Sequence, residues 1–190
     1  MCEAPLETPL AGAVCEACWS AVARFTPPAT AIGEYEGVLR EIIHALKYRG
    51  RRSTAPRLAA LMAQQGVDIL AGADAVVPVP LHPKRERERG FNQADDLARG
   101  LGLPVARLLK RVKSTKAQVD LPADERRVNV KDAFEVVRGR SEDRPLQVLV
   151  VVDDVTTTGA TLEACARVLK RAGVLEVRAL TAARVSSVPR

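Results

Sequence analysis

One segment of the chain joins an aliphatic run to two carboxylates and a threonine-rich loop. It reads Leu149-Val-Val-Val-Asp153-Asp154-Val-Thr156-Thr157-Thr158-Gly159-Ala160-Thr161. The aliphatic part predicts a buried strand at 148–152, because β-branched residues suit a sheet that is covered on both faces. Two adjacent acids are costly inside such a strand, so we expect Asp153 and Asp154 to emerge at its C-terminal end. Backbone N–H groups and hydroxyls then converge at a helix start, which is an arrangement that suits a phosphate.

A plainer interpretation of this segment is a strand, a turn and a capped helix with solvated acids. For the Asp-Asp pair alone that interpretation is the better one. The order of two acids, three threonines, a glycine and another threonine is much rarer, and it favours a phosphate site.

Helical and strand patterns alternate along the rest of the chain. Helices are expected from Glu34 to Gly50, from Pro56 onward, from Phe91 to Leu101 with Asn92 as its cap, and from Ala160 to Ala172. Strands are expected at 74–79, 105–112, 148–152 and 176–183. The alternation predicts an α/β fold with a mainly parallel sheet and helices on both faces. Ligands in such sheets bind beyond the carboxyl ends of the strands, where the loops after Val79 and Val152 both lie.

The loop after the strand at 74–79 is rich in cations. The stretch runs Val77-Pro-Val-Pro-Leu81-His82-Pro83-Lys84-Arg85-Glu-Arg87-Glu-Arg89-Gly90-Phe91-Asn92-Gln93. Arginine suits a pyrophosphate group because its planar fork binds two phosphate oxygens at once. The alternative is a basic helix start with Glu86 and Glu88 as surface partners. His82 is either a ligand contact or a solvated loop residue.

Composition bounds the class of protein but does not identify a function. At 190 residues, with 47% hydrophobic and 27% charged residues, the chain fits one domain with a small appendage. The net charge of +6 permits nucleic acid, nucleotides or pyrophosphate as partners, yet solvated arginine-rich faces give the same charge. No apolar run approaches the roughly 20 residues that cross a bilayer. The N-terminus contains Glu3 and Glu7 and lacks the basic region with which a secretory signal begins, so no secretory signal is expected. We therefore expect a cytoplasmic protein.

Several motifs together resemble the ComF family of competence-associated phosphoribosyltransferase-like proteins. They are Lys47-Tyr48-Arg49-Gly50, Pro78-Val-Pro-Leu-His-Pro-Lys-Arg85, Arg89-Gly-Phe-Asn-Gln93 and the pattern from Thr115 through Gln118, Arg126 and Asn129 to Phe134. The segment 149–161 resembles the signature with which type I phosphoribosyltransferases bind phosphoribosyl pyrophosphate (PRPP). Thr156 departs from that signature, since many members carry an aliphatic residue there.

The resemblance implies a type I phosphoribosyltransferase fold and a role for each motif. Asp153 and Asp154 would contact the ribose 2′- and 3′-hydroxyls, and together with Lys84 and Arg85 they would be the catalytic residues. The 5-phosphate would be held by the loop of Thr156, Thr157, Thr158, Gly159, Ala160 and Thr161. The pyrophosphate loop would consist of Leu81, His82, Pro83, Lys84 and Arg85. The stretch 113–133 would be a mobile loop that closes over the site, with Thr115, Gln118, Arg126 and Asn129 as its functional residues. Mg²⁺ would bridge the pyrophosphate and ribose oxygens.

Three functions are compatible with these motifs. The first is Mg²⁺-dependent transfer of ribose 5-phosphate from PRPP to an unknown acceptor, with release of pyrophosphate. The second is a PRPP- or nucleotide-binding adaptor without turnover that acts with competence-machinery proteins in DNA uptake. The third is direct binding of single-stranded DNA, against which the 3% aromatic content argues, because base stacking needs aromatic platforms.

Residues 1–30 differ from the remainder, 31–190, because they hold three of the four cysteines. Cys15 and Cys18 form a CxxC pair, which in a cytoplasmic protein predicts metal binding before a disulfide. Cys2 is a third ligand for Zn²⁺, but a closed structural site needs four. ComF members resemble a pattern of two CxxC pairs, and Cys2 matches the second cysteine of the first pair. The hypothesis is an incomplete zinc site whose missing ligand lies upstream of Met1 or has been lost. Cys165 is expected to be a small core residue.

Overall fold

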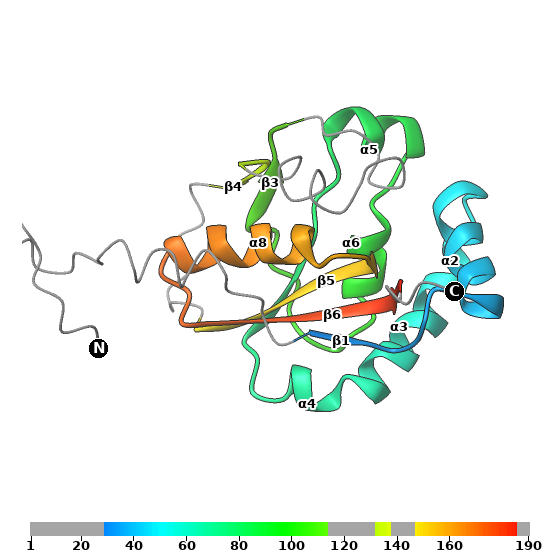
Figure 1. Cartoon of the computed structure of the whole chain (residues 1–190), viewed down its shortest axis with the longest axis horizontal. Helices are drawn as coiled ribbons and strands as arrows, with labels where there is room; N and C mark the ends of the chain where they lie inside the picture. The colour runs from blue at the N-terminus through cyan, green and yellow to red at the C-terminus, as the bar shows by residue number, and fades with distance from the viewer. Residues whose placement is uncertain (1–28, 114–131, 138–146, 186–190) are drawn as a thin grey trace, which may run out of the picture.

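Figure 1 shows a computed structural model of the chain, which describes residues 29–113, 132–137 and 147–185. The three cysteines proposed as zinc ligands lie outside these ranges, as do the four residues assigned to the mobile loop. These residues are Cys2, Cys15, Cys18, Thr115, Gln118, Arg126 and Asn129. Within the described ranges no helix has the length and hydropathy to cross a membrane.

The centre of the fold is a four-stranded parallel sheet with the order β1-β6-β5-β2. Its strands are β1 (Ala29–Ala31), β2 (Ala75–Pro78), β5 (Val148–Thr156) and β6 (Glu176–Arg184). Two short antiparallel strands, β3 (Leu109–Arg111) and β4 (Phe134–Val136), form a separate ribbon. The parallel sheet that the alternating pattern predicts is therefore confirmed.

Helices cover both faces of the sheet, as predicted. One face packs against α2 (Gly37–Tyr48), α3 (Ala55–Gln65) and α6 (Gln93–Ala98), while the other packs against α8 (Ala160–Arg171) and the β3–β4 ribbon. In Figure 1, α8 lies along one side of β5 and β6, and α3 lies on the opposite side. Short helical segments complete the fold: η1 (Arg52–Thr54), α4 (Val67–Leu70) and α5 (Pro83–Arg89).

The residues of β5 alternate between the two cores. Leu149 and Val151 are buried against α8, whereas Val150 and Val152 are buried against α2, α3 and α6. This period of two is the expected geometry of a strand covered on both faces.

The acids do not end β5, so the predicted C-terminal end of this strand is wrong. β5 continues to Thr156 because β6 extends beside it, with Asp153 opposite Thr181 and Thr156 opposite Arg184. β2 stops earlier: its last paired residue is Pro78, and the final bond runs from the N–H of Val79 to the carbonyl of Val152. Beyond Val152, β5 is thus paired on the β6 side and open on the side that β2 has left.

Other elements depart from the sequence-based expectations in detail. The strand predicted at 105–112 divides into a single bridge between Val105 and Val76 and the separate strand β3. The first helix begins at Gly37, three residues after Glu34, and β1 precedes it. The cap of α6 is confirmed, because the side-chain oxygen of Asn92 accepts the N–H of Ala94 at 3.0 Å.

Candidate functional site

A cavity of about 360 Å³ lies at the carboxyl edge of the sheet, beside the last residues of β5 and the loop that follows β2. The sequence assigned functional residues to two separate stretches, and the cavity contains members of both. Its lining includes Leu81, Arg85, Asp153, Asp154, Thr157 and Thr161. Ligands of parallel α/β sheets bind in this position, so the fold and the motifs point to the same place.

Asp154 is buried and ion-paired. The residue is 3% exposed, and one of its carboxylate oxygens lies 3.0 Å from the ammonium nitrogen of Lys47 at the end of α2. Burial opposes a charge on Lys47, but the carboxylates of Asp154 and Asp153 outweigh it and raise the pKa of the lysine. Removing one partner of such a buried pair costs about 3 kcal/mol or more, because the other charge is left uncompensated.

Asp153 occupies the opposite face of β5, and its environment is different. Its carboxylate accepts the backbone N–H of Asp154 at 2.8 Å. Burial, followed by the neighbouring charge of Asp154, raises the pKa of Asp153 to about 8, although Lys47 acts in the other direction. The two acids are therefore not equivalent: Asp154 has a cationic partner at 3.0 Å, whereas burial raises the pKa of Asp153.

The threonine segment forms the turn between β5 and α8. Gly159, with φ 75°, precedes the first residue of α8, and the hydroxyl of Thr158 accepts the N–H of Ala160 at 3.4 Å. Thr157 and Thr161 line the cavity, while Thr156 ends β5 and its carbonyl accepts the N–H of Val185. Thr156, Thr158, Gly159 and Ala160 are not among the lining residues. The turn and the start of a 12-residue helix supply N–H donors suited to an anion.

The stretch assigned to the pyrophosphate loop becomes a helix from Pro83 onward. A ring nitrogen of His82 accepts the N–H of Lys84 at 3.2 Å and so caps α5. The Lys84 side chain is 71% exposed and lies 4.0 Å from the carboxylate of Glu88. The basic helix start is thus the correct local structure, and the loop is shorter than predicted. The helix still directs cations inward, since Arg85 and Arg89 both line the cavity, whereas His82, Pro83 and Lys84 do not.

Sequence reasoning missed two cations of the cavity, Lys47 and Arg111. Lys47 belongs to the Lys47-Tyr48-Arg49-Gly50 motif of the family resemblance, but it was not assigned to the site. Arg111 follows from the pairing of β3 with β4, which places its guanidinium 5.4 Å from the ring centre of Phe134. Burial, and then the charge of Arg85, lower the pKa of Arg111. An anion between these two arginines would relieve their mutual repulsion.

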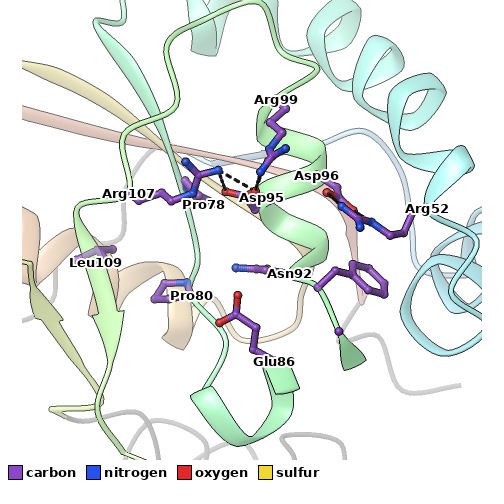
Figure 2. Close-up of a pocket in the computed structure, with 12 residues that line it drawn as sticks. Arg52, Pro78, Pro80, Glu86, Asn92, Asp95, Asp96, Arg99, Arg107 and Leu109 are labelled. Carbon is purple, nitrogen blue, oxygen red and sulfur yellow. Dashed lines mark hydrogen bonds and ion pairs between the residues drawn. The ribbon is translucent and has the colours of Figure 1, made fainter. Parts of the chain in front are cut away.

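A second cavity, of about 530 Å³, lies behind the segment that ends β2 (Figure 2). Its three arginines and two aspartates form ion pairs with one another. Asp95 of α6 contacts Arg99 at 2.9 Å and Arg107 at 2.7 Å, and Asp96 binds Arg52 at 2.7 Å. Figure 2 shows Arg99 and Arg107 converging on Asp95. These pairs connect α6 to η1 and to the segment before β3.

The comparisons with known proteins agree with this geometry. Residues 87–188 match the family described as "Phosphoribosyl transferase domain". The chain is 40% identical over 116 residues to "Competence protein F" of Haemophilus influenzae, covering 58% of this chain and 50% of that protein. It is 35% identical over 159 residues to "DNA utilization protein YhgH" of Salmonella typhi, covering 77% of this chain and 67% of that protein. The chain belongs to the ComF family.

A more distant ComF-family relative is "Competence protein ComFC" of Bacillus subtilis, at 29% identity over 140 residues, 73% of this chain and 56% of that protein. This ComF-family chain therefore matches about half to two thirds of the length of these relatives. The matches confirm the resemblance found in the motifs. Together with the parallel sheet between helices, they assign the type I phosphoribosyltransferase fold.

Proposed function

We propose that this ComF-family chain binds PRPP with Mg²⁺ in the 360 Å³ cavity and transfers ribose 5-phosphate to an acceptor, releasing pyrophosphate. The observation that carries the proposal is the charge pattern of the cavity wall. The lining combines Asp153 and Asp154 with Thr157 and Thr161, which flank the start of α8, and with Arg85 of α5 and Arg111 of β3. A pentose with a phosphate at one end and a pyrophosphate at the other has the complementary pattern.

Each end of the ligand is matched by a different element. The turn around Gly159 and the start of α8 would hold the 5-phosphate, and Arg85 with Arg111 would hold the pyrophosphate. Asp153 and Asp154 would accept hydrogen bonds from the ribose hydroxyls. One oxygen of Asp154, Oδ2, is buried without a hydrogen-bond partner among the described residues, so this carboxylate has capacity for a further donor.

The residues of the cavity are compatible with Mg²⁺ that arrives with its ligand. In the described ranges no three His, Cys, Asp or Glu side chains gather into a metal site of their own. Mg²⁺ in phosphate-binding sites keeps several waters and relies on substrate oxygens with one or two carboxylates, which this cavity offers. When bound, the ion would neutralise charge that develops on the pyrophosphate.

In the proposed transfer, the bond from ribose C1 to the pyrophosphate oxygen breaks and a bond from C1 to the acceptor forms. The departing pyrophosphate takes the electron pair, and the acceptor loses a proton. The arginines contribute by stabilising the charge of the leaving group, which is the usual largest contribution of such sites. The acceptor stays unassigned.

The names of the relatives, which concern competence and DNA utilization, support a role in DNA uptake. The proposal includes a cytoplasmic location and contact with competence-machinery proteins. Because those names describe a process and not a reaction, they also favour a second candidate, a PRPP-binding adaptor without turnover.

Thermal unfolding with PRPP and Mg²⁺ tests the binding proposal. A ligand of the native state raises the melting temperature, and Asp153→Ala with Asp154→Ala is expected to abolish that increase. A matched control removes two exposed acids, Glu41→Ala with Asp68→Ala, and keeps the increase. An equal increase in wild type and in the Asp153/Asp154 variant would show that PRPP binds elsewhere.

Release of pyrophosphate separates the enzyme from the adaptor. PRPP is incubated with nucleobases, amines and single-stranded DNA as acceptors, and pyrophosphate is measured. Release above that of the Asp153→Ala/Asp154→Ala variant supports transfer. Binding of PRPP without such release favours the adaptor.

A further inference from the structure

The two acids of the cavity differ in what surrounds them, and Lys47 causes the difference. Asp153 and Asp154 point to opposite faces of β5, since successive residues of a strand alternate. Asp154 therefore meets α2, whose last full turn carries Lys47. Asp153 meets the opposite side, where Cys165 of α8 and Arg111 are close enough to interact with its charge.

The contact between Lys47 and Asp154 is nearly closed to solvent. The lysine side chain is 16% exposed and the aspartate side chain 4%, with 3.0 Å between Nζ and Oδ1. A carboxylate buried to this extent is costly to leave without a hydrogen-bonded partner, and Lys47 is that partner here. The other carboxylate oxygen of Asp154, Oδ2, has no hydrogen-bond partner among the described residues. Lys47 therefore binds one oxygen, and the second can accept a hydrogen bond from a hydroxyl of the ligand.

Lys47 also connects this carboxylate to α2, an element to which the sequence motifs assigned no role in the site. It is the penultimate residue of α2, and the buried side chains of Ile43 and Leu46 fix that helix on the sheet. The ammonium group is thus held by a packed helix and not by a loop. A cation on a rigid support orients a ligand-binding carboxylate more reproducibly than a solvated one does.

We propose that Lys47 is a positioning residue that holds the buried carboxylate of Asp154 in place for the ribose hydroxyls of the ligand. Under this proposal Asp154 is an acceptor anchored by a cation, whereas Asp153 on the other face of β5 has no part in the contact with Lys47 at 3.0 Å. The inference rests on the proposed binding of PRPP and adds a residue to which no role had been assigned.

The test measures the affinity of four proteins for Mg²⁺–PRPP and for Mg²⁺–pyrophosphate by calorimetry: wild type, Lys47→Met, Lys47→Gln and Lys47→Arg. Lys47→Met is expected to lower the affinity for PRPP by about tenfold or more, which corresponds to the loss of one charge-assisted hydrogen bond. Lys47→Arg retains the charge and is expected to rescue most of the loss. Lys47 acts at the ribose end, so the affinity for PRPP should fall more than the affinity for pyrophosphate. The ratio of the two affinities should change by about fivefold.

Lys47→Gln covers the case in which Lys47→Met does not fold. The amide still donates a hydrogen bond to Asp154 but has no charge, so this variant is expected to fold and still to bind PRPP more weakly than Lys47→Arg does. Thermal unfolding without ligand confirms that each compared protein is folded.

Two outcomes overturn the proposal, and they differ. If wild type does not bind PRPP, the proposed function fails and the role of Lys47 fails with it. Only the role of Lys47 is refuted if wild type binds PRPP and a folded Lys47→Gln or Lys47→Met variant binds it equally well. The same conclusion follows if such a variant loses affinity for PRPP and for pyrophosphate in equal proportion.

Discussion

Asn92 joins the end of β2 to the start of α6 through the backbone of Val79. Its amide nitrogen donates to the carbonyl of Val79 at 3.0 Å, while its amide oxygen accepts the N–H of Ala94 at 3.0 Å. One side chain therefore caps a helix and fixes the segment at which β2 leaves the sheet. That segment continues into Pro80 and Leu81, which line the cavity.

The two functions of Asn92 are separable by substitution. Asn92→Asp keeps the oxygen that caps α6 but replaces the amide N–H₂ by a carboxylate oxygen. That oxygen cannot donate to the carbonyl of Val79, so the bond to Val79 is lost. Asn92→Ala removes both bonds and is expected to lower the free energy of unfolding by about 1–3 kcal/mol. We expect Asn92→Asp to lose stability while the helix remains capped, as chemical denaturation and amide exchange in α6 would show. Equal stability of wild type and Asn92→Asp would contradict the contribution of the Val79 bond.

The raised pKa of Asp153 predicts how stability depends on pH. Its pKa is about 8 in the folded chain and near the ordinary value of 3.8 when unfolded, so the folded state binds the proton more tightly. Stability attributable to this group is then greatest below its unfolded pKa and decreases as pH rises toward 8. Asp153→Asn removes the charge, and we expect it to raise stability by about 1–2 kcal/mol at pH 8, which is a few degrees in melting temperature.

The control for this pH effect is Asp68→Asn, which changes an exposed acid of α4. The gain from Asp153→Asn should be small at pH 5 and should grow up to pH 8.5. A gain that is independent of pH would show that the ionisation of Asp153 is not its cause. The same substitution is expected to weaken PRPP binding, so stability and function oppose one another at this residue.

Pyrophosphate binding should depend on the arginines that line the cavity and not on charge in general. Arg85→Met and Arg111→Met each remove a cation that lines the cavity, and Arg87→Met removes an exposed cation from the same helix as Arg85. We expect the first two to reduce the stabilisation by Mg²⁺–pyrophosphate by about 1.5–3 kcal/mol each, the usual contribution of a hydrogen bond to a charged group. Melting temperatures with and without pyrophosphate measure the effect. If Arg87→Met has the same effect, the attraction is a long-range property of the surface.

The turn before α8 requires a left-handed residue. Gly159 has φ 75° and no atom within 4 Å of an added Cβ, so Gly159→Ala is opposed by backbone strain and not by a clash. A cost of about 1 kcal/mol is expected from chirality alone. Gly72→Ala is the matched control, because Gly72 has φ 68°, equally open surroundings and no place in the cavity. Both variants should lose similar stability, but only Gly159→Ala should also lose affinity for PRPP, as measured by calorimetry.

Local patterns were sufficient to predict the elements whose stability is itself local. The aliphatic run of β5, the helix that begins at Ala160 and the Asn92 cap are encoded within a few neighbouring residues. All three were predicted, although β5 extends beyond its predicted end. The position of the cavity also followed, because parallel strands present their carboxyl ends at one edge of the sheet.

The features that sequence reasoning missed depend on contacts between distant segments. The extension of β5 through Asp153 and Asp154 is possible because β6 pairs with it and Lys47 compensates a buried charge. Nothing near residue 154 in the sequence reveals a lysine at position 47. Arg111 enters the cavity for a similar reason, since the short β3–β4 ribbon that carries it is formed across a separation in the chain.

The helix α5 has no buried residue, although Arg85 and Arg89 on it line the cavity. Substitutions on α5 therefore encounter few packing constraints from the core. Over evolutionary time such a helix can change its charges, and with them the anion that the cavity prefers, while the sheet and its covering helices stay intact. Ligand preference and foldability are in this way encoded in separate parts of one small chain.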